Sequence, residues 1–302
     1  MQLMGCNFEI TVVASSKIEA DKNIDAAVLE IKRIETLISS WISNSQTSFI
    51  NKYAGIRPVE VDPELVELIE RAKSISKLTD GAFDISFASI DKVWQFDGSM
   101  MKMPSKEIIN QSVELIGFEN IIIDNGNSSV FLKKKGMKIG FGGIGKGYAA
   151  DKAKELLQKN GIESGIINAS GDMNTWGRQP NGERWKVAFT NPFDKQKSFG
   201  LLPIEKGAVV TSGNYEKFVV FNDVRYTHII DPRTGYPSSG ILSVTIFAPK
   251  AELADALATS VFVMGIETGL NRINQLPNIE CIIIDEKGKI HQSKNIKITH
   301  EN

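Results

Sequence analysis

The sequence predicts an α+β fold, in which mostly antiparallel sheets pack with helices, and two observations carry this prediction. Along the chain, helical spacing of apolar residues gives way to short strands separated by turn residues. Several of these strands are arranged as hairpins, whereas a doubly wound parallel sheet would alternate single strands with helices. With 302 residues and no repeat or linker, we expect a single domain, 1–302, large enough to contain two packed lobes.

The first half of the chain shows three helical patterns. In residues 20–40, apolar side chains recur every three or four positions. A second helix is predicted after Asp62, which is a suitable N-cap followed by proline, and it should end before Gly81. A third helix should follow Ser105 and extend to about Ile116.

Strand signals dominate later in the chain, although helices return at 147–160 and 250–264. A hairpin is predicted where the turn residues NGNS separate NIIID from SVFLKK. ECIIIDEKGKIHQS predicts another hairpin near the end of the chain. Five further runs have strand composition: GIINAS, WKVAFT, AVVTSG, KFVVFNDVRYTHII with a turn at Asn222–Asp223, and LSVTIFA.

Composition narrows the function classes. The net charge is −1, so the chain has no basic surplus of the kind that nucleic acids or anionic membranes attract. No apolar run approaches the ~18 residues of a membrane helix. Cys6 and Cys281 provide neither a disulfide framework nor a zinc motif. The N-terminal MQLMGC is preceded by no charged or apolar stretch, so no export signal is expected in this sequence.

A glycine-rich stretch, KIGFGGIGKGYAADKAKELL at 138–157, matches parts of two nucleotide-binding motifs. A dinucleotide fingerprint needs an acidic residue about 20 positions later at the end of the next strand. Here that strand ends in Asn168 and Ser170. An ATP-binding loop needs Ser or Thr after its lysine to hold magnesium, and this chain has Gly147 there. Both interpretations are therefore disfavoured.

The loop nevertheless suits an anion. Its glycines allow a ligand close to the backbone, it opens a helix whose first N–H groups are free, and Lys146 adds a positive charge. The alternative is a tight turn with Lys146 in solvent.

Two further patterns suggest chemistry. Asp255 and Thr259 stand at i and i+4 on one helix face, and their oxygens suit Mg²⁺; alternatively, the Thr259 hydroxyl bonds back to the carbonyl of residue 255. His228 is expected on a strand that leads into an Asp-Pro turn. It is a candidate base at neutral pH or, alternatively, a core histidine.

Seven motifs in order along nearly the whole chain resemble those of the FAD:protein FMN transferase family, also called ApbE-type flavin transferases. They are LMGC at 3–6, TDGAFDIS at 79–86, GFGGIGKGYAADKA at 140–153, NASGDM at 168–173, VVTSGNYEK at 209–217, HIIDPRTGYP at 228–237 and ADALATSVFVMG at 254–265. The resemblance implies an ApbE-like fold of two lobes in one compact unit, with the site between them.

The resemblance also implies an enzyme that binds FAD and Mg²⁺, moves FMN to a threonine or serine hydroxyl of another protein, and releases AMP. Carried over by position, Asp255, Thr259 and the backbone carbonyl of Gly143 would hold Mg²⁺. Lys146 would face the pyrophosphate, and His228 would take the proton from the acceptor hydroxyl. The flavin or adenosine pocket would be lined by Met4, Trp41, Ala82, Phe83, Asp84, Ser212 and Ile229.

Three positions depart from the family pattern. Gly140 stands where the family's loop usually has Asp, Ser170 replaces a usual glycine, and Trp41 occupies the place of an expected Tyr. Trp41 keeps a stacking face but lacks a hydroxyl, and one alternative is a Mg²⁺-dependent FAD pyrophosphatase with water as nucleophile. The missing Asp at position 140 supports a second alternative, a flavin-binding or scaffold protein without turnover, against which the intact set of His228, Asp255 and Thr259 argues.

By resemblance the partner would be a subunit of a membrane redox complex. The same resemblance implies a periplasmic or membrane-anchored protein whose leader has been removed, although the residues themselves are equally compatible with the cytoplasm.

Overall fold

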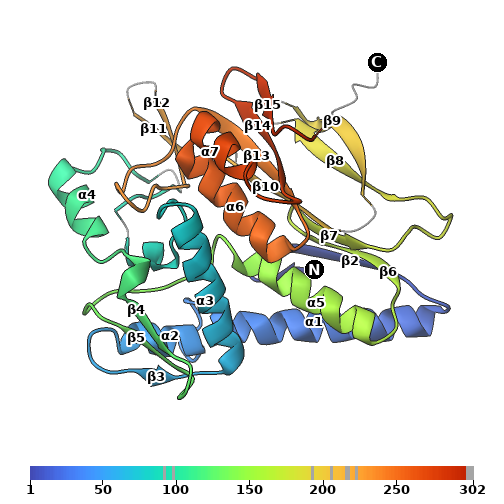
Figure 1. Ribbon diagram of the computed structural model, residues 1–302, viewed down its shortest axis with the longest axis horizontal. Coiled ribbons are helices and arrows are strands. Elements are labelled where there is room, and N and C mark those ends of the chain that lie inside the picture. The colour runs from blue at the N-terminus through green and yellow to red at the C-terminus, as the bar shows by residue number, and fades with distance from the viewer. Residues whose placement is uncertain are drawn as a thin grey trace.

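The fold is built around one large antiparallel sheet. A computed structural model describes residues 1–90, 93–96, 99–191, 194–204, 207–214, 218–221 and 224–296. Eight strands follow the spatial order β1-β2-β6-β7-β10-β13-β14-β15 (Figure 1). Their bounds are β1 Gln2–Leu3, β2 Cys6–Val13, β6 Ser164–Ala169, β7 Asp172–Trp176, β10 Gly207–Gly213, β13 Ile241–Ala248, β14 Glu280–Asp285 and β15 Ile290–Gln292.

Three smaller sheets accompany it, and every strand pair in the described ranges is antiparallel. One has the order β3-β5-β4, and the others are the hairpins β8–β9 and β11–β12. Their bounds are β3 Val59–Glu60, β4 Ile121–Asp124, β5 Ser129–Leu132, β8 Trp185–Asn191, β9 Asp194–Ile204, β11 Phe218–Phe221 and β12 Val224–Thr227. The α+β prediction and the hairpins β4–β5 and β14–β15 are confirmed. The predicted turn at Asn222–Asp223 lies outside the described residues.

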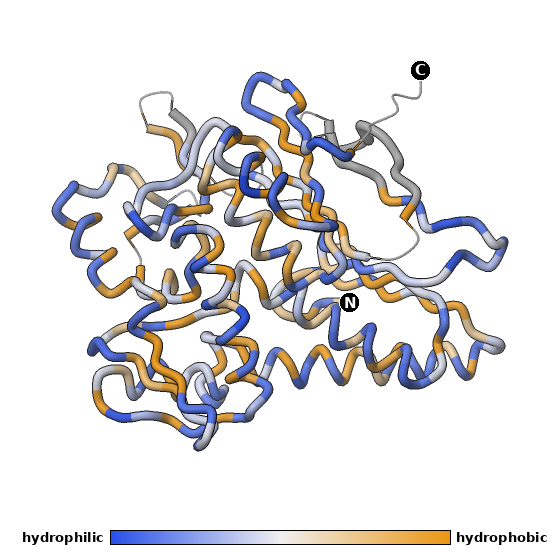
Figure 2. The backbone as a smooth tube through the Cα atoms, viewed as in Figure 1, coloured by the Kyte–Doolittle hydropathy of each residue, from blue (hydrophilic) through white to orange (hydrophobic). Residues whose placement is uncertain are grey.

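The predicted helices are also confirmed, with small shifts at their ends. The helices are α1 Lys17–Ile38, α2 Gln46–Lys52, α3 Pro63–Leu78, α4 Lys106–Val113, α5 Gly145–Lys159, α6 Ala251–Met264, α7 Ile266–Ile273 and the 3₁₀ turns η1 Ile85–Ser89 and η2 Phe118–Asn120. Side-chain caps set the starts of α1, α2, α3 and α4, because Ser16, Ser45, Asp62 and Ser105 each accept a hydrogen bond from a first-turn N–H. Figure 2 shows polar and apolar residues alternating along α1, as expected for a helix with one face in the core.

The helices pack against the large sheet in sequence order. α1 contacts β2 and α5, α5 contacts β6 and β7, and α6 contacts α5, β10 and β13. A second, smaller apolar cluster forms around Trp94, Ile109 and Ile230. Within the described ranges, no helix is long and apolar enough to cross a membrane. This packing places the starts of α5 and α6, both rich in predicted site residues, against one another (Figure 1).

Candidate active site

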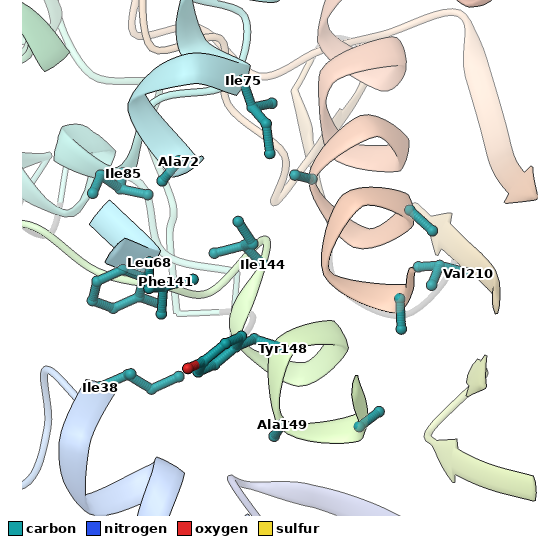
Figure 3. Close-up of a cluster of buried hydrophobic side chains, with 14 of the residues drawn as sticks. Ile38, Leu68, Ala72, Ile75, Ile85, Phe141, Ile144, Tyr148, Ala149 and Val210 are labelled. Atoms are coloured by element: carbon teal, nitrogen blue, oxygen red, sulfur yellow. The ribbon is translucent and has the colours of Figure 1, made fainter. Parts of the chain in front are cut away.

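The glycine loop, residues 140–147, is anchored in the core. Phe141 and Ile144 are buried, and Figure 3 shows them among side chains of α1, α3 and η1. Just before the loop, the side-chain amide of Asn51 accepts from the N–H of Ile139 at 2.7 Å and donates to its carbonyl at 2.9 Å. The loop therefore follows a fixed course into α5.

The glycines of this loop are of two kinds. A β-carbon at Gly145 would lie 2.9 Å from Cδ1 of Ile38. One at Gly147 would lie 2.2 Å from the carbonyl oxygen of Ala251, so packing alone requires glycine there. A β-carbon at Gly142 would meet nothing within 4 Å, and this residue is exposed. The loop thus combines packing glycines with an open stretch that a ligand can approach.

Lys146, in the first turn of α5, bonds through its ammonium group to the carboxylate of Asp172 at the start of β7. Asp172 is only 1% exposed, whereas the Lys146 side chain is 31% exposed. The same ammonium acts on Asp255: burial raises the pKa of the Asp255 carboxyl, and the charge of Lys146 opposes part of that rise. Lys146, the residue predicted to face the phosphates, thus interacts with two buried carboxylates, Asp255 of α6 and Asp172 of β7.

The predicted metal ligands meet at the same place. Asp255 accepts a hydrogen bond from the N–H of Gly147 at 3.2 Å. A β-carbon at Gly143 would lie 3.1 Å from Oγ1 of Thr259, so the loop backbone and this hydroxyl are neighbours. Among the described residues the Thr259 hydroxyl has no hydrogen-bond partner, whereas the adjacent Ser260 bonds back along the helix at 2.6 Å. The expected alternative for Thr259, a back bond to residue 255, is therefore not found.

These donors fit a hard cation. A carboxylate, a hydroxyl and a backbone carbonyl supply only oxygen, and Mg²⁺ takes few protein ligands and keeps several waters. In the described part of the chain, no group of three or more His, Cys, Asp or Glu side chains gathers to hold a metal. A transition-metal site of that kind is thus not formed by these residues, and the mixed oxygen set around Asp255 is the candidate.

The segment Ala82–Asp84 is buried beside the loop. Cε2 of Phe83 would lie 3.5 Å from a β-carbon at Gly143, which brings this segment to the candidate metal ligands. The Asp84 carboxylate accepts from the N–H and hydroxyl of Ser86 and from the N–H of Phe118, and burial raises its pKa. Asp84 therefore shapes the backbone here, and its predicted contact with flavin or adenosine stays a prediction.

His228 lies in the smaller apolar cluster. It follows β12 directly instead of lying on a strand, because the strand pairing ends one residue earlier. Its ring packs edge-on against Phe96, with ring centroids 6.5 Å apart and an interplanar angle of 76°. Trp94 stacks on Phe96 and donates from Nε1 to the carbonyl of Gly235 at 2.8 Å. His228 is half-buried and precedes the buried Ile229 in the chain, so this position fits both a base at neutral pH and a core histidine.

A cavity of about 540 Å³ lies between the 79–84 segment and the Pro232–Arg233 turn that follows His228 in the chain. Cγ of Arg233 would lie 3.6 Å from a β-carbon at Gly81, so the two segments touch. The cavity is lined by Ser76, Lys77, Asp80, Gly81, Asp84, Val113, Ile116, Gly117, Phe118, Glu119, Pro232 and Arg233. Two motifs that are about 150 residues apart in the chain thus form one concave surface.

The remaining predicted residues differ in their relation to the loop. Met4 reaches it, because its Cε would lie 3.7 Å from a β-carbon at Gly145. Ser212 is half-buried on β10, the strand that packs against α6. Trp41 is 94% exposed, so its large apolar face is available to a ligand.

Two of the three family departures have a local explanation. A β-carbon at Gly140 would lie 3.0 Å from Cβ of Ala88 and 3.6 Å from Oγ of Ser40, so these two side chains occupy the adjacent space. Ser170 has φ of 54°, a conformation that favours glycine. Its hydroxyl compensates by accepting from the N–H of Asn7 at 3.0 Å and donating to the carbonyl of that residue at 3.1 Å.

Sequence reasoning missed two carboxylates near the site. Asp172 and Asp151 lie within the quoted motifs NASGDM and GFGGIGKGYAADKA, but they received no role. Asp172 holds Lys146, and Asp151 bonds to the first turn of α6. Their positions in those motifs were a usable signal, although the sequence did not indicate their partners.

Comparisons with known proteins identify relatives of this chain. A model described as the ApbE family matches residues 4–283. The chain is similar to an FAD:protein FMN transferase of Klebsiella pneumoniae, with 33% identity over 262 residues, 86% of this chain and 81% of that protein. It is also similar to the FAD:protein FMN transferase of Treponema pallidum, with 31% identity over 281 residues, 88% of this chain and 78% of that protein.

Solved structures have the same fold. The ApbE protein of Thermotoga maritima superposes with a TM-score of 0.90 at 33% identity, covering 100% of this chain and 98% of that one. The flavin transferase ApbE of Vibrio cholerae gives a TM-score of 0.86 at 25% identity, with coverage of 97% and 95%.

Proposed function

Because the chain belongs to the ApbE family and is a transferase, we propose that it is a Mg²⁺-dependent FAD:protein FMN transferase. It would move FMN from FAD to a threonine or serine hydroxyl of a target protein and release AMP. The observation that carries this proposal is the meeting of the open glycine loop, Lys146 and the Asp255–Thr259 pair at the start of α5.

The pyrophosphate of FAD would bind at the glycine loop. The first turn of a helix attracts anions, and α5 has no cap from its own N-cap residue, although the N–H groups of Gly145 and Gly147 already donate to the Phe141 carbonyl and to Asp255. Lys146 adds the cationic charge there, while Gly142 leaves the approach unobstructed. The role of these groups is to orient the phosphorus and to favour the negative charge that develops around it.

Mg²⁺ would be held by the side chains of Asp255 and Thr259 and by the backbone carbonyl of Gly143. When bound, the ion would neutralise charge on the pyrophosphate and on the leaving AMP. Support comes from a buried carboxylate next to a hydroxyl that has no partner among the described residues. The positive charge of Lys146 also acts on the Asp255 carboxyl and lowers its pKa against the effect of burial.

His228 would act as the base. The acceptor hydroxyl gives its proton to the imidazole as its oxygen bonds to the FMN-side phosphorus, and the bond from that phosphorus to the AMP oxygen breaks. The edge contact with Phe96 restrains the ring. We also propose that Met4, Trp41, Ala82–Asp84, Ser212 and Ile229 line the flavin and adenosine pocket, with Trp41 as a stacking face.

By family resemblance, the acceptor would be a subunit of a membrane redox complex, and the enzyme would work in the periplasm or at the membrane. Water could replace the acceptor hydroxyl without any change in the site, which would make the chain an FAD pyrophosphatase.

One experiment separates the two reactions. The protein is incubated with FAD, Mg²⁺ and a candidate acceptor, flavin fluorescence of the denatured acceptor is read on a gel, and free FMN is measured separately. Fluorescence on the acceptor that requires Mg²⁺ supports transfer, whereas free FMN alone supports hydrolysis. If the protein binds FAD but forms neither flavinylated acceptor nor free FMN, the flavin-binding alternative is supported. Asp255→Asn is the inactive control.

A further inference from the structure

The starts of α5 and α6 hold each other through reciprocal contacts. The N–H of Gly147 in α5 donates to the Asp255 carboxylate of α6 at 3.2 Å. In the other direction, the N–H groups of Ala251 and Glu252 in α6 donate to the two carboxylate oxygens of Asp151, at 3.0 and 2.9 Å. In each helix the carboxylate stands one turn after the amide, so the two turns interlock.

Asp151 supplies a cap that α6 lacks. The residue before α6, Lys250, makes no side-chain capping bond, so its first N–H groups need an acceptor from elsewhere. A carboxylate at this position also interacts favourably with the helix dipole. Asp151 therefore replaces a local cap with one from a different helix, about 100 residues away.

The position of Asp151 is itself constrained. The side-chain amide of Asn174 in β7 donates to Asp151 at 2.5 Å, and Lys154 donates to Asn174 at 2.8 Å. Asn174 is fully buried. β7 also begins with Asp172, the partner of Lys146. One strand therefore positions both Lys146 and the reciprocal bonds between α5 and α6, which we call the helix clasp.

The spacing of the two helices is equally restricted, since a β-carbon at Gly147 would overlap the Ala251 carbonyl oxygen at 2.2 Å. The far end of α6 has separate support, because Leu257, Val261 and Phe262 are buried in the main core. Loss of Asp151 should therefore disturb mainly the first turns of α6, which carry Asp255 and lead to Thr259.

We propose that Asp151 is a positioning residue for flavin transfer, which holds α6 where Asp255 and Thr259 meet Gly143 and Lys146. This role rests on the proposed function, because it assumes that these groups bind the metal and the pyrophosphate. Asp151 itself touches neither: its carboxylate is fully engaged by the protein.

The test compares Asp151→Ala, which removes both acceptor oxygens, with Asp151→Asn, which keeps one. The metal probe is Mn²⁺, whose binding is followed by electron paramagnetic resonance without turnover. We expect Asp151→Ala to weaken Mn²⁺ binding at least about tenfold and to lower kcat about as much, with the KM for FAD changed less than about threefold. Asp151→Asn should retain part of both properties, and it carries the test if the alanine variant does not fold.

The matched control is Leu157→Ala, which removes a fully buried side chain from the same helix α5 without touching the clasp. It should lower the melting temperature while leaving the affinity for Mn²⁺ unchanged. If Asp151→Ala were destabilised but kept the Mn²⁺ affinity and kcat of the wild type, the positioning role would be overturned and the proposed function would stand. A wild-type protein that neither binds Mn²⁺ nor transfers flavin would overturn the proposed function, and this role with it.

Discussion

The ammonium group of Lys146 pairs with Asp172, a carboxylate that lies 26 residues away in the chain and is almost completely buried. The two partners differ in exposure, and this difference gives the pair an asymmetric energetic role. Removing Lys146 leaves a buried charge without its partner, whereas removing the charge of Asp172 leaves an ammonium that water still reaches.

Lys146→Met is therefore expected to lower the free energy of unfolding by about 3–5 kcal/mol, the usual cost of an uncompensated buried charge. Asp172→Asn should be less destabilising, and the double variant should be more stable than Lys146→Met alone. Urea denaturation of the four proteins measures all three differences. Additive effects of the two substitutions would show that the pair contributes no coupling energy.

Asp255→Asn is expected to abolish Mg²⁺-dependent turnover and to leave the protein folded. Asn keeps the shape of the side chain and can still accept from the N–H of Gly147, but it lacks the negative charge that would attract the metal. A bound metal ion contributes several kcal/mol at a transferring phosphoryl group. Activity as a function of Mg²⁺ concentration is the measurement, with a melting curve beside it. Wild-type turnover with the same magnesium dependence would contradict the metal assignment.

His228→Ala is expected to slow transfer by about 10²–10⁴, the range for loss of a general base. FAD affinity should change much less, because the imidazole would handle a proton and not hold the ligand. Single-turnover rates and FAD titrations distinguish these effects. A variant that no longer bound FAD would indicate that the ring serves mainly to pack against Phe96.

Trp41→Ala should weaken FAD binding by about 1–3 kcal/mol, by analogy with base–aromatic stacking. Because this indole is 94% exposed, the free energy of unfolding should stay within about 0.5 kcal/mol of wild type. If the ring also shields the phosphorus from water, the ratio of free to protein-bound FMN should rise. Unchanged FAD affinity together with an unchanged ratio would remove Trp41 from the site.

Glu64 in α3 makes stability depend on pH. It accepts from Arg33 of α1 at 2.7 Å and from Tyr148 of α5 at 2.5 Å. Burial alone would raise the pKa of Glu64, but these hydrogen bonds and the charge of Arg33 outweigh burial and lower it from 4.5 to about 2. A depressed folded-state pKa stabilises the fold above the unfolded value, and this contribution is lost as the pH falls from about 4.5 toward 2.

Glu64→Gln should therefore lower the free energy of unfolding at pH 7 by about 1–2 kcal/mol, a value discounted for solvent screening of a partly exposed group. Denaturation at a series of pH values should show the deficit shrinking between pH 4.5 and 2. Glu67→Gln is the matched control on the same helix, because Glu67 is 70% exposed and lies 3.9 Å from its nearest cation, Arg71. A deficit that did not change with pH would exclude the ion pair as its cause.

Local sequence was sufficient to predict the elements whose signals are local. The cap at Asp62 and the Asn125–Gly126 turn act within a few residues, so the α3 start and the β4–β5 hairpin followed from the sequence. The ordered motifs led to the family for the same reason, since they are contiguous in the chain. Two short helices were not predicted: α2 is only seven residues long although Ser45 caps it, and α7 has eight residues and no side-chain cap.

Only the tertiary structure decided which distant groups meet. Nothing local to β2 indicates that it pairs with β6, about 150 residues later, because pairing depends on the packing of both strands in one sheet. The same holds for the packing glycine at 147, whose neighbour is the carbonyl of Ala251, and for Asp151 as the cap of α6. Chain folding brings these partners together, and their energies come from burial and direct contact, which a linear pattern of residues does not contain.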